Sequence, residues 1–263
     1  MSSRIVAVAN QKGGVGKTTT TINLAASLAL GEQRVLLVDV DPQGNLTSGV
    51  GQKGKASEAG TVYHALTTAD PTTDARPFVV RTSVDRMDLI PADRNLTGAE
   101  IEMVTLSGRE ERLRALLASV RDDYDWIFVD CPPSLGLLTL NALVAADAVL
   151  IPLHCEYFAL EGVADLVGTM RRVRAALNPA LDIEGVLLTM FDERTNLGQQ
   201  VATDVRAFFK DKVFRTVIPR NVRLGEAPSH GMPVILYDVK SRGAEAYLAL
   251  AREVLERSAA TAA

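Results

Sequence analysis

The stretch ANQKGGVGKTTT, residues 9–20, decides the fold of this chain. An apolar, strand-like run at residues 5–9 enters it, and a helix-like run at residues 19–30 leaves it. Glycines between a strand and a helix let successive backbone N–H groups face an anion, which the positive end of the helix dipole also attracts. We therefore predict a phosphate-binding loop in which Lys17 neutralises phosphate charge and the Thr18 hydroxyl ligates Mg²⁺.

This loop departs from the usual pattern G-x-x-x-x-G-K-[ST] at its start. Gln11 stands where the first glycine belongs, and Lys12 adds a second cation beside it. Three glycines that follow still supply the backbone cradle. A dinucleotide-binding loop is excluded, because Thr19 stands where that fingerprint requires glycine. A glycine-rich turn without a ligand is the remaining alternative.

The rest of the chain alternates apolar, strand-like runs with helix-like stretches. Most of the strand-like runs are continuously apolar, as expected for strands covered on both faces. We predict an α/β fold with a doubly wound, mostly parallel sheet flanked by helices, in a single domain spanning residues 1–263 whose last six or so residues are disordered. Strands are expected at residues 4–9, 34–39, 87–91, 126–130, 148–153, 183–190 and 213–218, helices at 19–30, 109–120, 162–177, 199–210 and 243–257, and a flexible loop at 49–60.

Composition limits the class of protein. The chain has 263 residues, of which 47% are apolar and 23% charged, so it can bury a sizeable core. Cys131 and Cys155 alone indicate neither a disulfide framework nor a zinc site. No apolar run approaches the ~20 residues needed to cross a bilayer, and the N-terminal apolar stretch is too short for a signal peptide. We expect a cytoplasmic protein.

Acidic residues follow two of the expected strands. Asp39 and Asp41 stand two positions apart in VLLVDVDPQGN, a spacing that on a strand points both side chains to one face. Asp130 ends the run WIFVD and would hold Mg²⁺, usually through water. The carboxyl ends of parallel strands form the edge where ligands bind. A turn after Asp41 and a simple strand-terminating acid at Asp130 are the alternatives.

The motif KGGVGKTT closely resembles the deviant Walker A motif of the ParA/MinD family of P-loop ATPases. Lys12 corresponds to the signature lysine of that family, which reaches across a dimer interface to the ATP of the other subunit. Such a cation in trans ties ATP binding to dimerisation, like an arginine finger. The resemblance implies ATP and Mg²⁺ as cofactors, with the ATP held by Lys12, Gly13, Gly14, Val15, Gly16, Lys17, Thr18 and Thr19.

The same resemblance implies further roles. Asp41 would orient the attacking water, and Asp39 would lie near the metal and support Lys17 or Thr18. The catalytic residues are then Lys12, Lys17 and Asp41, and the metal is held by Thr18, Asp130 and Asp39. Residues 132–136 would form a switch loop that senses the γ-phosphate. TVIPRNVRLGEAPSHG resembles the ParA signature and would place Pro219 and Asn221 against adenine, although a proline-rich turn is an alternative.

Four other branches of the family fit the residues less well. An iron-sulfur reductase needs cysteines in glycine-rich surroundings, which neither cysteine here has. A MinD-like membrane ATPase, the main alternative function, should end in a basic amphipathic helix, whereas YLALAREVLERSAATAA balances its charges. A plasmid-type ParA carries an additional DNA-binding domain ahead of the first strand, and an ATP-binding scaffold without hydrolysis is expected to lack Asp41. The chain is most similar to Soj-like chromosomal ParA.

Charge distribution bears on the partner. The chain carries a net charge of −4, yet between Arg194 and Arg223 seven basic residues face two acidic ones. A positive zone on an acidic body is typical of phosphate-backbone binding, with a solvated helix face as the alternative. In Soj-like proteins the arginines at the positions of Arg194 and Arg223 bind DNA; Arg206, Lys210 and Lys212 are further candidates. About four phosphate contacts per dimer give a salt slope of roughly −3.6.

The resemblance as a whole implies a chromosome-partitioning ATPase. ATP would drive formation of a homodimer that binds double-stranded DNA without reading its sequence, and hydrolysis would release it. A ParB-type centromere-binding protein would stimulate hydrolysis through its basic N-terminal segment. We expect the protein to be nucleoid-associated and to have no membrane partner.

Overall fold

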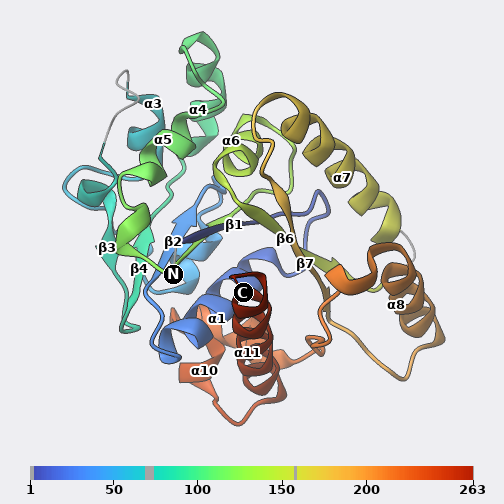
Figure 1. The fold of residues 1–263 in the computed structure, drawn as a ribbon. Coiled ribbons are helices and arrows are strands. Elements are labelled where there is room, and N and C mark those ends of the chain that lie inside the picture. The colour runs from blue at the N-terminus through green and yellow to red at the C-terminus, as the bar shows by residue number, and fades with distance from the viewer. Residues whose placement is uncertain (1–2, 69–73, 157–158, 263) are drawn as a thin grey trace.

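A computed structural model describes residues 3–68, 74–156 and 159–262 of the chain. At its centre is a seven-stranded sheet in the order β3-β4-β2-β5-β1-β6-β7 (Figure 1). All neighbouring strands are parallel except β3 and β4. This confirms the predicted doubly wound, mostly parallel α/β fold. The strands are β1 (Arg4–Val8), β2 (Val35–Asp39), β3 (Val80–Arg81), β4 (Met87–Ile90), β5 (Trp126–Asp130), β6 (Ala148–His154) and β7 (Asp182–Thr189).

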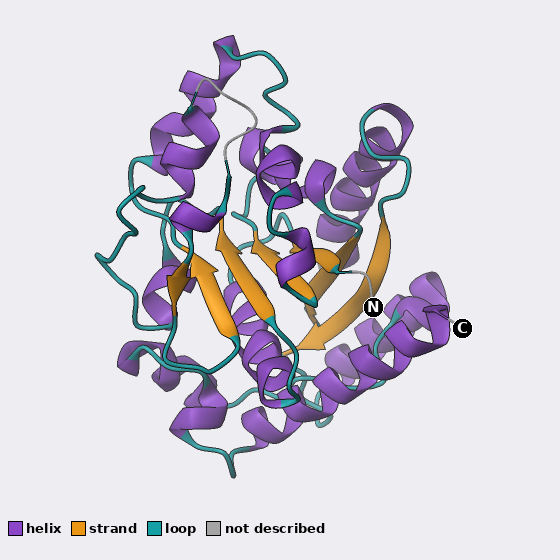
Figure 2. Cartoon of the chain, turned by 60° about the vertical axis from the view of Figure 1, so that its left-hand side comes forward, coloured by secondary structure: helices purple, strands orange, loops and turns teal. Residues whose placement is uncertain are grey.

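Helices cover both faces of the sheet, which Figure 2 shows from a second side. Helices α1, α10 and α11 lie against one face, and α5, α6 and α7 lie against the other (Figure 1). The helices are α1 (Lys17–Leu30), α2 (Asn45–Gly49), α3 (Val62–Thr67), α4 (Leu96–Glu102), α5 (Arg112–Ala118), α6 (Leu137–Ala145), α7 (Ala159–Ala176), α8 (Asn196–Phe209), α9 (Val222–Glu226), α10 (Val234–Tyr237) and α11 (Arg242–Ala262). Short 3₁₀ turns are η1 (Arg76–Phe78), η2 (Met103–Thr105), η3 (Arg121–Asp123), η4 (Lys210–Lys212) and η5 (Ala227–His230).

Strand β1 shows why the strands read as continuous apolar runs. Ile5 and Ala7 belong to the core that α5, α6 and α7 cover, whereas Val6 and Val8 belong to the core that α1 and α11 cover. Successive side chains of a strand point to opposite faces, so a strand between two helical layers buries every residue. All four of these side chains are buried.

The expected strand at residues 213–218 is wrong. Val213 and Pro219 each form a single bridge, to Val186 and Phe191 respectively, with no regular ladder between them. The segment is apolar because Phe214 is fully buried, filling the space that Gly185 of β7 leaves open. The sequence pattern therefore reflects packing against β7. Strand β3, with two residues, was not predicted.

The C-terminal helix extends further than expected. Helix α11 was predicted to end at Arg257 and to be followed by a disordered tail, but it continues to Ala262. Alanine has the highest helix propensity, and no glycine or proline interrupts these residues. The expected loop at residues 49–60 begins at the end of α2 and consists mainly of turns, with a bridge between Ser57 and Gly60. Across the part of the chain that the structure describes, no helix is long and apolar enough to cross a membrane.

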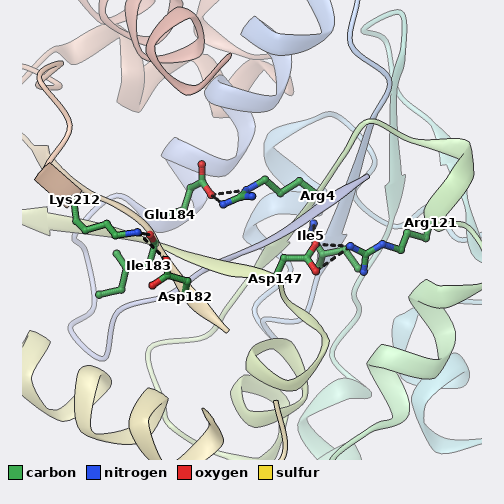
Figure 3. Close-up of polar contacts among 8 residues, drawn as sticks. All are labelled: Arg4, Ile5, Arg121, Asp147, Asp182, Ile183, Glu184 and Lys212. Carbon is green, nitrogen blue, oxygen red and sulfur yellow. Dashed lines mark hydrogen bonds and ion pairs between the residues drawn. The ribbon is translucent and has the colours of Figure 1, made fainter. Parts of the chain in front are cut away.

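Ion pairs close the amino-terminal ends of the central strands, which we call the amino edge (Figure 3). Arg4 at the start of β1 lies 2.6 Å, Nε to Oε2, from the buried Glu184 of β7. Asp147, just before β6, accepts hydrogen bonds from the backbone N–H of Ile5 at 2.8 Å and from Arg121 at 2.7 Å. These contacts join β1, β6 and β7 at the side of the sheet opposite to the glycine loop.

Candidate functional site

The glycine loop connects β1 to α1 at the carboxyl-terminal ends of the strands, the carboxyl edge. Gly14 and Gly16 have φ angles of 72° and 87°, a region that residues with a Cβ seldom adopt. Gly16 is also the N-cap of α1, so the loop leads directly into the free N–H groups of that helix. The backbone has the shape needed to hold an anion.

A cavity of about 900 Å³ opens above this loop. Val15, which was also predicted to bind ATP, is buried and does not line this cavity. Its carbonyl accepts a hydrogen bond from Thr189 Oγ1 at 2.8 Å. Of the residues predicted to bind nucleotide, water or metal, the cavity is lined by Gly13, Gly14, Gly16, Lys17, Thr18, Thr19, Asp41, Pro219 and Asn221. Segments from both halves of the sequence thus meet at one site.

Asp130 lies fully buried behind Thr18. Its two oxygens accept hydrogen bonds from Thr18 Oγ1 at 2.7 Å and from Thr21 Oγ1 at 3.0 Å. Burial, followed by the charge of Asp39, raises the pKa of Asp130 to about 8, against the opposing effect of the two hydroxyls. A carboxylate in this position is stabilised by any cation that arrives next to Thr18.

Lys17 is the cation already present at the base of the cavity. Its side chain is largely buried, and Nζ donates a hydrogen bond to the carbonyl of Lys12 at 3.2 Å. Burial lowers the pKa of Lys17, while the charges of Asp130 and Asp41 act in the opposite direction. The groups of its own chain therefore do not fully offset the cost of burying this positive charge, and an anion in the cavity would stabilise it.

Asp39 lies beside Asp130 in the register of β2 and β5, but its side chain makes other contacts than the expected ones. Its Oδ2 accepts hydrogen bonds from the backbone N–H and the hydroxyl of Thr47, at 2.9 and 2.7 Å, and its Oδ1 accepts from the N–H of Asp41 at 3.2 Å. The prediction that Asp39 supports Lys17 or Thr18 is therefore wrong. Its carboxylate oxygens bind Thr47 and the N–H of Asp41, which fixes the turn before α2 and the first turn of that helix. Burial raises its pKa to about 6.

Asp41 follows the end of β2 and lines the cavity. Its Oδ1 accepts the backbone N–H of Gln43 at 2.9 Å, which forms the turn that the sequence offered as an alternative. Asp41 therefore both forms a turn and lines the cavity. Strand β2 ends at Asp39, within the expected range of residues 34–39, so Asp41 lies in the turn that follows the strand.

The donor set fits Mg²⁺ together with a phosphate. Within the described ranges, no group of three or more His, Cys, Asp or Glu side chains forms a metal site. Mg²⁺ keeps several waters and is usually bound through one or two protein groups plus substrate phosphates. The Thr18 hydroxyl, with Asp130 directly behind it, has this character.

The far wall of the cavity comes from the turn before α9. Asn221 Oδ1 accepts the N–H of Arg223 at 2.9 Å and caps α9, so the side-chain NH₂ is the group it can offer to a ligand. Tyr247 of α11 also lines the cavity and shares a 3.1 Å hydroxyl contact with Thr20 of α1. Tyr247 was not predicted from the sequence, since 227 residues separate it from Thr20.

Arg194 and Arg223 both lie on exposed loops or helix ends near the carboxyl edge. Arg194 follows β7, is 88% exposed and pairs with Asp192 at 2.7 Å. Arg223 pairs with Glu226 at 2.7 Å and with Asp238 at 3.2 Å. Exposed pairs of this kind contribute little to stability, so a phosphate can displace the carboxylates.

Lys212 lies elsewhere. Its ammonium group donates to Asp182 at 2.8 Å and to the carbonyl of Ile183 at 3.0 Å, at the amino edge (Figure 3). The structure therefore separates Lys212 from Arg194 and Arg223, whereas Arg206 and Lys210 are exposed on and just after α8.

Lys12 is absent from the residues that line the cavity of its own chain. Its backbone N–H donates to Asn10 Oδ1 at 3.0 Å, and its ammonium group forms an ion pair with Glu156. Glu156 was not predicted from the sequence, because the pair joins residues 144 positions apart and no motif marks the acid.

Comparisons with known proteins agree with this geometry. A family model described as an AAA domain matches residues 3–183. The chain is 58% identical to the sporulation initiation inhibitor protein Soj of Bacillus subtilis, over 95% of this chain and 98% of that protein. It is 56% identical to the chromosome partitioning protein ParA of Myxococcus xanthus, over 97% and 88% of the two chains.

A solved structure is also similar over nearly its whole length. It is described as cobyrinic acid a,c-diamide synthase from Mycobacterium smegmatis with bound ADP and magnesium, and it has a TM-score of 0.81 and 38% identity, covering 96% of this chain and 94% of that one. Loop, site and relatives agree: the chain belongs to the ParA/MinD family of deviant Walker A P-loop ATPases, on its Soj-like branch, and is an ATPase.

Proposed function

We propose that this chain is a chromosome-partitioning ATPase that dimerises when it binds ATP and Mg²⁺, and that the dimer holds DNA without reading its sequence. The observation that carries the proposal is the separation of the two lysines of one loop. Lys17 lines the cavity of its own chain, whereas Lys12 lies outside it with its side chain 36% exposed. A lysine so placed is available to the nucleotide of a second subunit.

Within one subunit, each residue has a distinct task. The loop N–H groups and Lys17 bind and orient the β- and γ-phosphates. Thr18 and Asp130 hold Mg²⁺, which when bound supplies positive charge to the phosphate oxygens. Asp41 positions the attacking water from its place in the cavity wall, and Asp39 fixes the Asp41 loop through Thr47.

At the other end of the cavity, Pro219 and Asn221 contact adenine. The oxygen of Asn221 is used to cap α9, so its NH₂ group donates to the base. Apolar walls from Ile22 and Leu224 exclude water from the ring. The capping bond fixes the side chain before nucleotide arrives.

DNA is held by Arg194 and Arg223, which contact phosphates and not base edges. A groove of about 930 Å³ runs between the β7–α8 loop, the turn before α9, and α11. Its charged lining residues are three arginines and three acids, Arg194, Arg220, Arg242, Asp192, Glu193 and Glu245, so a polyanion has to displace carboxylates such as Asp192 to reach the guanidinium groups. Binding to the phosphate backbone makes the protein nucleoid-associated and gives its DNA affinity a steep dependence on salt.

The partner that ends the cycle is a ParB-type protein with a basic segment. The acidic chain, with a net charge of −4, attracts such a segment. Its binding raises the rate of hydrolysis, which dissolves the dimer and releases DNA.

A MinD-like membrane function is the alternative. The packing of α11 disfavours it, because Tyr247, Leu250 and Val254 of this helix are buried in the chain's own core. Glu253 of the same helix accepts the backbone N–H groups of Arg215 and Thr216 at 2.8 and 2.9 Å, which holds the helix in place. ATP-dependent sedimentation with anionic liposomes that requires α11 would replace our proposal.

The Mycobacterium smegmatis protein is named for a different reaction, the synthesis of a cobyrinic acid diamide. We favour partitioning because the relatives named Soj and ParA are 58% and 56% identical, against 38% for that structure.

The proposal is tested by ATP-dependent retention on DNA of arbitrary sequence. Asp41→Ala should dimerise and hold DNA for longer than the wild type, because hydrolysis is slow. Arg194→Ala and Arg223→Ala should each reduce retention and make the salt slope shallower by about 2 per dimer. Arg76→Ala, which removes an exposed charge at η1, is the control and should leave retention unchanged. Normal retention in both site variants would reject the DNA surface.

A further inference from the structure

The surroundings of Lys12 contain a contact that the proposed function does not use. Its ammonium group is paired with Glu156, which follows β6. The second carboxylate oxygen of Glu156 lies 2.8 Å from His154 Nδ1. Glu156 thus joins Lys12 to the end of a neighbouring strand.

The main chain around Lys12 is held independently of this pair. Asn10 Oδ1 accepts the N–H of Lys12, and Asn10 Nδ2 donates to the carbonyl of Pro152 at 2.7 Å. Lys17 Nζ bonds the Lys12 carbonyl. Only the four-carbon stem of Lys12 is therefore left to move. Gly162 of α7 lies beside this stem without crowding it, since even a Cβ there would be 4.0 Å from Lys12 Cβ.

We propose that Glu156 is a positioning residue that holds Lys12 within its own subunit until a partner's ATP replaces it. This deepens the proposed function and rests on Lys12 bridging two subunits. The carboxylate carries one negative charge and polyphosphate carries several, so the phosphate attracts the ammonium group more strongly. Glu156 cannot accompany Lys12 to the phosphate, because two anions would then be brought together.

Replacement of the Glu156 carboxylate by the partner's ATP as the anion next to Lys12 makes dimerisation less favourable than it would be with a free Lys12. Each subunit has to break the contact between Lys12 and Glu156 before it can contact the partner's nucleotide. Both side chains are partly exposed, 36% and 47%, so the contact is weak enough to break. The hydrogen bond from Lys12 also lowers the pKa of Glu156, which keeps the carboxylate charged and ready to take Lys12 back after hydrolysis.

The variant Glu156→Gln tests this proposal by sedimentation, in an Asp41→Ala background in which ATP persists. We expect the protein concentration at half-dimerisation to fall by about two- to five-fold per Lys12 released. Glu156→Asp, which keeps the charge, should lie nearer to the parent. A gain in dimerisation cannot arise from partial unfolding, so a merely structural role for Glu156 predicts no such shift.

Two further variants make the result unambiguous. Glu111→Gln breaks a pair with Arg114 of similar exposure at the start of α5, and it should leave the dimerisation midpoint unchanged. An unchanged or raised midpoint in Glu156→Gln would overturn the proposal. Lys12→Ala separates this failure from that of the proposed function: if it dimerises normally, the bridging role itself is wrong, whereas if it stays monomeric while Glu156→Gln matches the parent, only the Glu156 contact is wrong.

Discussion

The two edges of the sheet carry charged side chains in opposite states. At the amino edge, Asp147 and Glu184 each face an arginine of the same chain. At the carboxyl edge, Asp130 is buried with a pKa raised to about 8, and its nearest partners are two hydroxyls. Acids that pair with an arginine of the same chain stabilise the fold. A buried acid without an ion-pair partner among the described residues of its own chain, such as Asp130, indicates where a ligand binds.

The largest difference between the two edges is expected when one lysine at each edge is replaced by alanine and ATP hydrolysis is measured. Lys17→Ala removes the cation that faces the phosphates, so we expect ATP hydrolysis to fall by about 10²–10³-fold. Lys212→Ala removes only the pair with Asp182 at the amino edge, so its hydrolysis should match the wild type. Steady-state phosphate release without DNA measures both. Equal losses in the two variants would contradict the assignment of the edges.

Exchanging Asp130 for asparagine should have effects of opposite sign on stability and function. The folded chain disfavours ionisation of Asp130, whereas the unfolded chain ionises it freely at neutral pH, so Asp130 costs the folded state free energy. Asparagine removes this cost, and without nucleotide the free energy of unfolding should rise by about 2–4 kcal/mol at neutral pH. Hydrolysis should be lost with the Mg²⁺ site. Denaturant unfolding and phosphate release on the same preparation measure the two effects, and a destabilised Asp130→Asn would contradict the account.

The same acids predict a dependence on pH. The pKa values of Asp39 and Asp130 are raised to about 6 and about 8, so between pH 4 and 8 the folded chain binds more protons than the unfolded chain. The free energy of unfolding of the nucleotide-free protein should therefore fall as pH rises through this range and level off above about pH 8. In Asp130→Asn the fall should end near pH 6. A wild-type curve that rises from pH 5 to 8 would contradict this.

The smallest effect is expected at the amino edge. Asp147→Asn keeps an acceptor for the N–H of Ile5 but weakens the partly exposed pair with Arg121, so unfolding should become easier by about 0.5–1 kcal/mol. Hydrolysis per folded molecule should not change. An aspartate-to-asparagine exchange is thus expected to stabilise the protein at the carboxyl edge and to destabilise it at the amino edge. Denaturation curves of Asp130→Asn and Asp147→Asn test this.

Much of the fold followed from local pattern. Continuous apolar runs located six of the strands, because parallel strands between helical layers bury both faces. The glycine loop was recognisable because phosphate binding requires consecutive residues. The segment at residues 213–218 was misassigned, since Phe214 is apolar for packing while its neighbours form no ladder.

The site was predictable where its residues belong to a motif and not where distant segments meet. Asp130 stands at the end of an apolar run, so its position is visible in the sequence. Asp39 was given the wrong contacts, because its partner Thr47 lies beyond a turn whose course no pattern specifies. Tyr247 and Glu156 reach the loop only through the tertiary fold, and neither is marked by a spacing.

The central claim is that one loop provides Lys17 to its own nucleotide and Lys12 to a second subunit. Sedimentation of Lys12→Ala with ATP and Mg²⁺, in the Asp41→Ala background, tests it most directly, with ATP affinity measured on the same protein. We predict a variant that stays monomeric at concentrations where the parent dimerises, while it still binds ATP through Lys17. A Lys12→Ala protein that dimerises like its parent would contradict the claim.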